Sequence, residues 1–208
     1  MSAPSTPSLH RTFVKVCGLR TAADVETAIT AGADAVGFVM AAGSPRHLEE
    51  AELATLVAAV GGRAQIVLVL RGVPVAEALA LHDRVGADVL QLHGYAPADE
   101  QLVVAAGVPL WIARGPADAS GGQVGGSGET AWLVDSPEAG SGEAWDHSAF
   151  VPPHGRWLVA GGLAPENVTA AIHELRPWGV DVSSGVESTR GVKDQARIRA
   201  FLAAARSA

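Results

Sequence analysis

Short runs of apolar and β-branched residues alternate along this chain with longer segments whose apolar positions recur at helical spacing. The predicted strands cover 13–17, 35–40, 65–70, 88–92, 108–113, 131–135, 157–160 and 179–182. Such alternation is typical of βαβ units and a parallel sheet. Eight strands favour closure, so the sequence predicts a single α/β domain of the (β/α)8 TIM-barrel type.

The helices between these strands carry recognisable start and stop signals. Thr21 is expected to open the first helix, and Gly61 and Gly86 to end the second and third. The first predicted helix opens at Thr21 and Asp24, with Val25, Ala28 and Ile29 at helical spacing, and the others cover 49–60, 74–85, 97–106, 165–175 and 194–205. The Gly-rich stretch 120–128 weakens the fifth helix, and the turn-rich stretch 135–148 leaves room for little more than a short helix. We therefore expect irregular fifth and sixth helical units.

Composition limits the other possibilities. The 208 residues suit one domain, and Ser/Pro-rich residues 1–12 are interpreted as a frayed extension ahead of a catalytic barrel over 13–208. A formal net charge of -7 gives no general attraction to nucleic acid or to anionic membranes, and no run is apolar enough to cross a bilayer. The single cysteine allows no internal disulfide and no multi-cysteine metal site, which favours a cytoplasmic protein.

Distinctive segments follow several predicted strands. They are KVCGL (15–19), SPRHL (44–48), LVDSPEAGSGEAWDH (133–147), AGGLAPENV (160–168) and DVSSGVE (181–187). In barrels of this type the chemistry lies where strands end, and phosphate is often held after strands seven and eight. Taken in this order, the segments resemble the phosphoribosylanthranilate isomerase family along nearly the whole chain after residue 12.

The resemblance implies a cofactor-free and metal-free Amadori rearrangement of N-(5'-phosphoribosyl)anthranilate, a phosphosugar of tryptophan biosynthesis. This reaction needs an acid to protonate the ring oxygen and a base to remove the C2' proton. The resemblance assigns Cys17 as the base and Asp135 as the acid. Taken alone, Cys17 is as readily a small buried core residue and Asp135 a turn residue. A free thiol is mostly protonated at neutral pH, so Cys17 needs a source of activation.

The resemblance also implies a residue for the substrate carboxylate. Arg46 matches the family arginine at this place, and a guanidinium offers paired planar donors. Its alternative interpretation is a solvated loop arginine. His93, in QLHG, matches a family segment but is equally compatible with a structural role.

Phosphate is expected at the last two strand ends. Glycines let a backbone approach a ligand closely, and a short helix offers free N–H groups to an anion. The residues of this predicted cradle are Gly161, Gly162, Ser183, Ser184 and Gly185. Ordinary turn and capping chemistry is the alternative. Asp181 either orients the site or caps a loop.

Some positions depart from the family pattern. His47 replaces a usual aromatic, LVLRGVP (68–74) replaces an aromatic and an asparagine, and WIARG (111–115) replaces a lysine-bearing strand end. Ala139 stands where the family has a glycine. We expect these changes to tune affinity without removing the chemistry.

The sequence leaves two other functions open. A related phosphosugar isomerase, including the type shared by histidine and tryptophan synthesis, would rely on paired aspartates, against which Cys17 argues. A catalytically silent phosphate-binding barrel would not need Cys17, Asp135 and Arg46 together. The partner is thus expected to be a small phosphosugar, and the protein a monomer or a homodimer.

Overall fold

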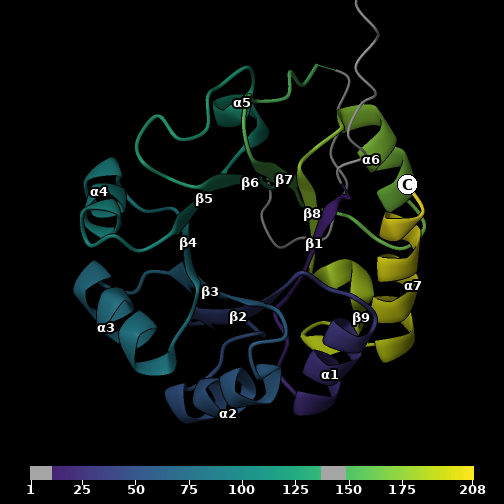
Figure 1. Ribbon diagram of the computed structural model, residues 1–208, viewed down its shortest axis with the longest axis horizontal. Helices are drawn as coiled ribbons and strands as arrows, with labels where there is room; N and C mark the ends of the chain where they lie inside the picture. Colours follow the sequence, from purple (N-terminus) through teal and green to yellow (C-terminus); the bar gives the residue numbers. More distant parts are fainter. Residues whose placement is uncertain (1–10, 137–148) are drawn as a thin grey trace, which may run out of the picture.

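The computed structural model describes residues 11–136 and 149–208. Eight parallel strands follow one another around a closed barrel, with helices on its outside (Figure 1). The strands are β1 (Phe13–Cys17), β2 (Ala35–Ala41), β3 (Gln65–Arg71), β4 (Val89–His93), β5 (Leu110–Arg114), β6 (Ala131–Val134), β7 (Trp157–Val159) and β8 (Gly179–Val182). The predicted (β/α)8 barrel is confirmed.

The helices agree closely with the start and stop signals. They are α1 (Ala22–Thr30), α2 (Glu50–Val60), α3 (Val75–Val85), α4 (Pro97–Ala105), α5 (Pro116–Ala119), α6 (Val168–Leu175) and α7 (Gln195–Arg206). Thr21 caps α1 by accepting a hydrogen bond from the Asp24 amide at 3.1 Å. Gly61 and Gly86 end α2 and α3 with φ of 59° and 69°, a conformation that costs glycine little.

The prediction for α6 was wrong at its start, which lies at Val168 instead of residue 165. Asn167 ties the preceding residues into a turn: its Oδ1 accepts from the Ala164 amide at 2.8 Å. Its Nδ2 donates to the Gly162 carbonyl at 2.9 Å. Local side-chain hydrogen bonds of this kind compete with the helix.

The fifth unit is irregular as expected, because α5 has only four residues. The short helix expected in 135–148 falls largely on residues 137–148, outside the described part of the chain. After β8 the chain forms a 3-10 turn, η1 (Ser184–Val186), and a small antiparallel hairpin of β9 (Glu187–Thr189) and β10 (Val192–Lys193). This hairpin was not predicted, since strands of two or three residues leave no periodic pattern.

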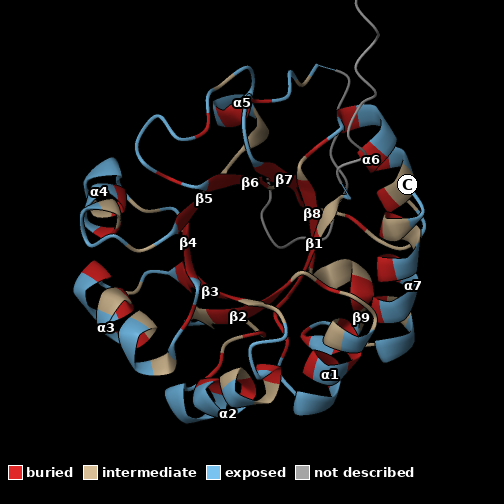
Figure 2. Ribbon diagram, viewed as in Figure 1, coloured by how far each residue is buried: buried red, intermediate tan, exposed pale blue. Residues whose placement is uncertain are grey.

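Buried residues follow the strands of the barrel and recur along the helices around it (Figure 2), and they form two apolar clusters. Small and branched side chains such as Ala35, Val67 and Leu133 fill the interior. A larger cluster lies between strands and helices. At the amino end of the strands Phe13 stacks on Trp178, with ring centres 4.3 Å apart, and Trp111 meets both edge-on. Aromatic packing therefore fills the barrel at the end opposite the strand termini that carry the predicted site.

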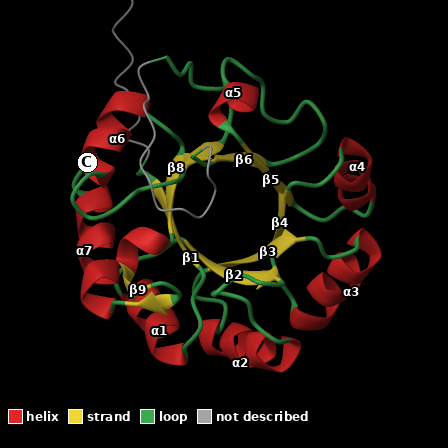
Figure 3. Cartoon of the chain, turned by 180° about the vertical axis from the view of Figure 1, so that it is seen from behind, coloured by secondary structure: helices red, strands yellow, loops and turns green. Residues whose placement is uncertain are grey.

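The first and last parts of the chain meet at the β1–β8 pair, which closes the barrel (Figure 3). In its register Lys15 lies beside Asp181 and Phe13 beside Gly179. From the end of α7, Arg206 reaches the Thr12 carbonyl and donates to Asp34 Oδ2 at 2.7 Å. No helix in the described part of the chain is long and apolar enough to cross a membrane.

Candidate active site

A hollow of about 170 Å³ opens at the carboxyl ends of the strands. Cys17, Arg46, Asp135 and Asp181 all line it, although they come from four separate strand ends. Its remaining walls are partly apolar, with Val39, Val69 and Leu133 among them. One hollow thus offers a thiol, two carboxyl groups and a guanidinium beside a surface suited to a flat ring.

Cys17 is the last residue of β1 and is 6% exposed. Burial raises the pKa of its thiol, and the cation of Lys15 acts in the opposite direction. The side chain is buried, as the core interpretation expects, and it also lines the hollow.

Asp135 follows β6 directly. Burial, assisted by the negative charge of Asp181, raises its pKa to about 6. Its Oδ1 accepts a 2.9 Å hydrogen bond from the Ser136 amide. A carboxyl group with this pKa is about one-tenth protonated at pH 7, far more than an ordinary aspartate, and so can act as a general acid.

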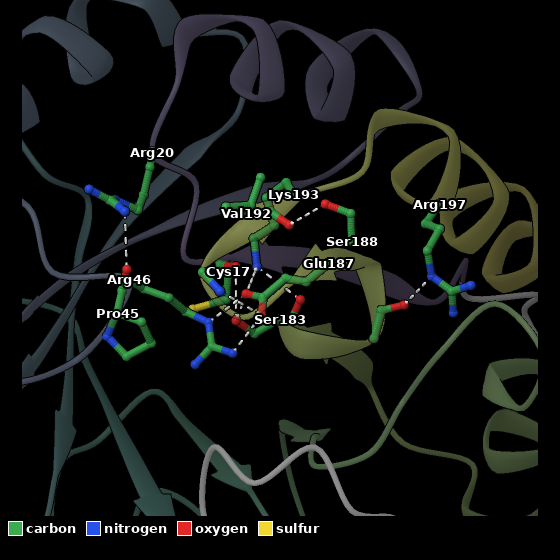
Figure 4. A network of polar contacts seen from close by, with 12 residues as sticks. Cys17, Arg20, Pro45, Arg46, Ser183, Glu187, Ser188, Val192, Lys193 and Arg197 are labelled. Atoms are coloured by element: carbon green, nitrogen blue, oxygen red, sulfur yellow. Dashed lines mark hydrogen bonds and ion pairs between the residues drawn. The ribbon is translucent and has the colours of Figure 1, made fainter.

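Arg46 is paired inside the protein and is not the solvated loop residue of the alternative interpretation. Its Nε donates to Glu187 Oε1 at 2.6 Å and its Nη2 to Glu187 Oε2 at 3.0 Å. Figure 4 shows this pair next to Cys17 and Ser183. The side-on contact leaves Nη1 without a hydrogen-bond partner among the described residues, so the outer edge of the guanidinium is available to a second carboxylate.

Lys193, on β10, binds the same carboxylate as Arg46. Its Nζ donates to Glu187 Oε1 at 2.9 Å and to the Ser183 carbonyl at 2.8 Å. With two cations beside it, the Glu187 carboxyl has its pKa lowered to about 2 despite burial. The β9–β10 hairpin therefore fixes Arg46 and also joins it to the end of β8.

Four of the five predicted cradle residues line a second, smaller hollow, and Gly185 is not among its lining residues. Gly161, Gly162, Ser183 and Ser184 line it together with Arg46 and Asp135. The amides of Gly162 and Ser184 donate no hydrogen bond to any residue the structure describes. Such free N–H groups at neighbouring loops suit an anion.

Close packing also requires two of these glycines. A Cβ at Gly161 would lie 2.5 Å from the Ser136 nitrogen and 2.9 Å from Asp135 Oδ1. A Cβ at Gly185 would lie 1.8 Å from the Leu163 carbonyl oxygen. These glycines hold the loops after β6, β7 and β8 against each other, in addition to any contact with a ligand.

Asp181 does not cap a loop. It lies within β8, and its Oδ1 accepts a 2.8 Å hydrogen bond from Lys15 Nζ inside the barrel. His93 also lines the hollow, where burial lowers its pKa to about 4 and keeps the ring neutral. Its Nε2 lies 2.6 Å from Gln91 Nε2, with donor and acceptor roles set by the tautomer.

Three residues of this site were not predicted: Lys15, Glu187 and Lys193. Lys15 left a usable signal, because a lysine inside the apolar run FVKVC indicates a buried ammonium group that needs a partner. In the structure this side chain is 0% exposed. Glu187 and Lys193 belong to the unpredicted hairpin; Glu187 ends the distinctive segment DVSSGVE, but nothing in the sequence marked it as the partner of Arg46.

The residues that depart from the family pattern lie in different surroundings. The Nδ1 atom of His47 accepts from the Ala41 amide at 3.1 Å, so this side chain serves the loop itself. Arg71, from LVLRGVP, is exposed and lines the hollow. Ala139 lies outside the described residues. Within 11–136 and 149–208, no group of three His, Cys, Asp or Glu side chains is placed to hold a metal ion.

A larger hollow of about 510 Å³ lies elsewhere, beside the ends of α2 and α3. Its lining is mostly glycine, alanine and aliphatic residues. Asp88 is its charged member, and that carboxylate already accepts from the Ile66 amide at 2.7 Å. Size alone does not make it the reactive site.

Comparison with known proteins agrees with this geometry. The family model described as "N-(5'phosphoribosyl)anthranilate (PRA) isomerase" matches residues 14–204. A curated relative of that name from Geotalea daltonii is 38% identical over 92% of this chain and 95% of its own length. The crystal structure of TrpF from Jonesia denitrificans has a TM-score of 0.87 at 47% identity, covering 94% of this chain and 97% of its own.

Another solved structure is that of a phosphoribosyl anthranilate isomerase in complex with reduced 1-(o-carboxyphenylamino)-1-deoxyribulose 5-phosphate. It has a TM-score of 0.78 at 27% identity and covers 95% of this chain and all of its own. Sequence, fold and family model therefore agree, and this chain belongs to the N-(5'-phosphoribosyl)anthranilate isomerase family.

Proposed function

We propose that this chain converts N-(5'-phosphoribosyl)anthranilate into 1-(o-carboxyphenylamino)-1-deoxyribulose 5-phosphate, an aldose–ketose isomerisation in tryptophan biosynthesis. The observation that carries the proposal is that Cys17 and Asp135 line one hollow from different strand ends. A base and an acid are thereby offered to the same small molecule. Family membership supports the choice of substrate.

Asp135 is proposed as the acid. It gives its proton to the ring oxygen as the C1'–O bond breaks, and the anthranilate nitrogen supplies the electron pair for the Schiff base. Its pKa of about 6 supports this role, because an ordinary aspartate would hold almost no proton at neutral pH.

Cys17 is proposed as the base. Its thiolate takes the C2' proton, the C2'–H electron pair becomes the C1'=C2' bond, and the C=N pair returns to nitrogen. When the resulting enol becomes the ketone, C1' takes a proton and the C2' hydroxyl loses one. Return of the thiol proton to C1' and of the hydroxyl proton to Asp135 restores both groups, so the cycle consumes no proton.

The binding contacts follow from the same placement. The free edge of Arg46 is proposed to take the anthranilate carboxylate in a paired contact. The phosphate is proposed to lie against Gly161, Gly162, Ser183, Ser184 and Gly185, with Asp181 supporting the site from within the barrel. A structure with the reduced product bound tests both contacts, and phosphate at another place would overturn the cradle assignment.

Activity is tested by the fluorescence loss of freshly made phosphoribosylanthranilate. We expect turnover by the native protein and a loss of at least about 100-fold in kcat for Cys17→Ala, the lower end for acid–base catalysis. Near-normal turnover of Cys17→Ala would remove the base assignment. No turnover by the native protein would overturn the proposed function itself.

The proposal includes a cytoplasmic location and either a monomer or a homodimer. A single cysteine, buried and unbridged, suits a reducing compartment. One structural neighbour consists of monomers generated from a dimeric family member of Thermotoga maritima. Sedimentation of the purified chain distinguishes the two states.

A further inference from the structure

The base proposed above is buried, and burial alone favours the neutral thiol. A functional thiolate therefore needs a cation close to sulfur. Two lysines occur in the chain, Lys15 and Lys193, and both lie near this site. Their settings differ: Lys193 is bound to Glu187 and the Ser183 carbonyl, whereas Lys15 lies two residues before Cys17 on the same strand.

Residues two apart on a strand face the same way, so Lys15 and Cys17 both point into the barrel. Lys15 is 0% exposed, so its charged ammonium group is buried inside the barrel. A lysine this deeply buried is costly unless its ammonium group is paired.

Gly37 makes room for the two side chains. In the β1–β2 register it lies beside Cys17. A Cβ at Gly37 would fall 2.8 Å from Cys17 Sγ and 3.1 Å from Lys15 Cε, so these two atoms are less than about 6 Å apart. A residue with any side chain here would push into the space between sulfur and lysine.

Asp181 fixes the other side of Lys15. Its Oδ1 lies 2.8 Å from Nζ, and the β1–β8 register places the two residues side by side. Asp181 is itself buried, 7% exposed. The ammonium group therefore contacts a buried carboxylate, and the Cys17 sulfur lies within about 6 Å of the Lys15 carbon that carries it.

From these positions, and resting on the proposed function, we infer that Lys15 is a positioning residue for the reaction. It keeps its proton throughout, stabilises the thiolate of Cys17 as base, and is held in place by Asp181. It moves no proton of its own and does not contact the substrate. The other charged groups around Cys17 are Lys193, Arg46, Asp135 and Asp181; the last two oppose the thiolate when ionised.

Lys15 and Asp181 have opposite effects on the pKa of the Cys17 thiol. Lys15 favours the thiolate and Asp181 disfavours it, in agreement with the signs of their influence on the Cys17 pKa. Lys15→Met should therefore raise the thiol pKa, and Asp181→Asn should lower it, although both remove one member of the same ion pair. A merely structural role for the pair predicts no such opposition.

The single cysteine makes the test direct. The alkylation rate by iodoacetamide is measured against pH in the native chain, Lys15→Met, Lys15→Arg and Asp181→Asn. Arg63→Met is the matched control, because it removes one positive charge from a surface pair with Glu26. We expect Lys15→Met to slow alkylation at neutral pH by about tenfold or more, corresponding to about one pKa unit.

Lys15→Arg should recover part of the rate, and Arg63→Met should match the native chain. The double variant Lys15→Met/Asp181→Asn leaves no unpaired buried carboxylate, so it is used if Lys15→Met does not fold. Its thiol should react more slowly than that of Asp181→Asn. Equal rates in that comparison, or a Lys15→Met profile within about twofold of the native one, would overturn the inference.

Turnover gives the second measurement. Lys15→Met should lose kcat by about the same factor as it loses thiolate, with KM little changed. Alkylation uses no substrate, so the two proposals fail separately. An inactive native chain whose thiol still responds to Lys15 would defeat the proposed function only, and an active chain with an unresponsive thiol would defeat this inference only.

Discussion

The Glu187 carboxylate binds one edge of the Arg46 guanidinium, 2.6 Å from Nε and 3.0 Å from Nη2, and Arg46 also lines the hollow. Glu187 thus determines the direction in which Arg46 presents its remaining donors. A flexible arginine would lose side-chain entropy on binding a carboxylate, and this pair has already lost it.

Glu187→Gln should weaken substrate binding more than turnover. The amide keeps the shape of the side chain but loses the charge and one of the two acceptors for Arg46. We expect KM to rise by about tenfold with a smaller change in kcat. Glu166→Gln is the control, since it weakens an exposed pair with Arg197. Equal kinetics in the two variants would contradict the role given to Glu187.

Arg46→Ala should raise KM strongly, and Arg46→Lys should restore only part of the affinity, because lysine keeps the charge but loses the fork geometry. Steady-state kinetics on both variants measure this. Arg84→Ala is a matched control: Arg84 holds Glu50 through the same two atoms, Nε and Nη2, on the exposed surface. Unchanged kcat/KM in Arg46→Ala would remove Arg46 from the site.

Asp135→Asn should lower kcat by at least about 100-fold. The pH profile gives a second signature, because the acid has a pKa of about 6 and the base has one above its ordinary value. Below pH 6, kcat/KM should rise with pH as thiolate forms. Above pH 6 it should level off, since each gain in thiolate is offset by lost protonated Asp135. In Asp135→Asn this break should vanish; a break that persists belongs to the substrate phosphate, whose pKa is also about 6.

The free energy of unfolding should depend on the protonation of the Asp135 carboxyl group. Its pKa is raised in the folded state, from 3.8 to about 6, so its favourable contribution is full below pH 4 and is lost as the pH rises through 6. Asp135→Asn should match the native chain in urea unfolding at pH 4 and exceed it by about 2 kcal/mol at pH 8.

Glu187→Gln serves as the opposite case in the same unfolding experiment. The pKa of the native Glu187 carboxyl is lowered from 4.5 to about 2. Its contribution to folding stability is therefore present above pH 4.5 and is lost as the pH falls through 2. The variant should be destabilised at pH 8. If Asp135→Asn and Glu187→Gln changed stability at pH 8 in the same direction, the pKa directions on which both expectations rest would be contradicted.

Gly161→Ala should reduce turnover by displacing Asp135, since the new Cβ would meet Ser136 and the Asp135 carboxylate. Gly43→Ala is a matched control: both glycines have φ of 79°, and the Gly43 position has no neighbour within 4 Å. Backbone strain of about 1 kcal/mol should appear in both variants. The loss of kcat should appear in Gly161→Ala alone, and similar kinetics in the two would place the effect in the backbone.

The barrel was predictable because its signals are local. Strand 13–17 and the caps at Thr21, Gly61 and Gly86 depend on short windows of sequence. The pairing of Arg46 with Glu187 joins residues 141 positions apart and was not predictable, because the hairpin carrying Glu187 has no pattern of its own. The ion pair of Lys15 could be anticipated, but its partner could be named only once the β1–β8 register was known.

The contact between Lys15 and Asp181 spans 166 positions and crosses the pair of strands at which the ring closes. During synthesis the amino-terminal side of this contact leaves the ribosome long before β8 does. Lys15, beside Cys17, must therefore stay without its carboxylate partner until nearly the whole polypeptide has emerged. Chains truncated before β8 should have no isomerase chemistry, however much of the remaining barrel they form.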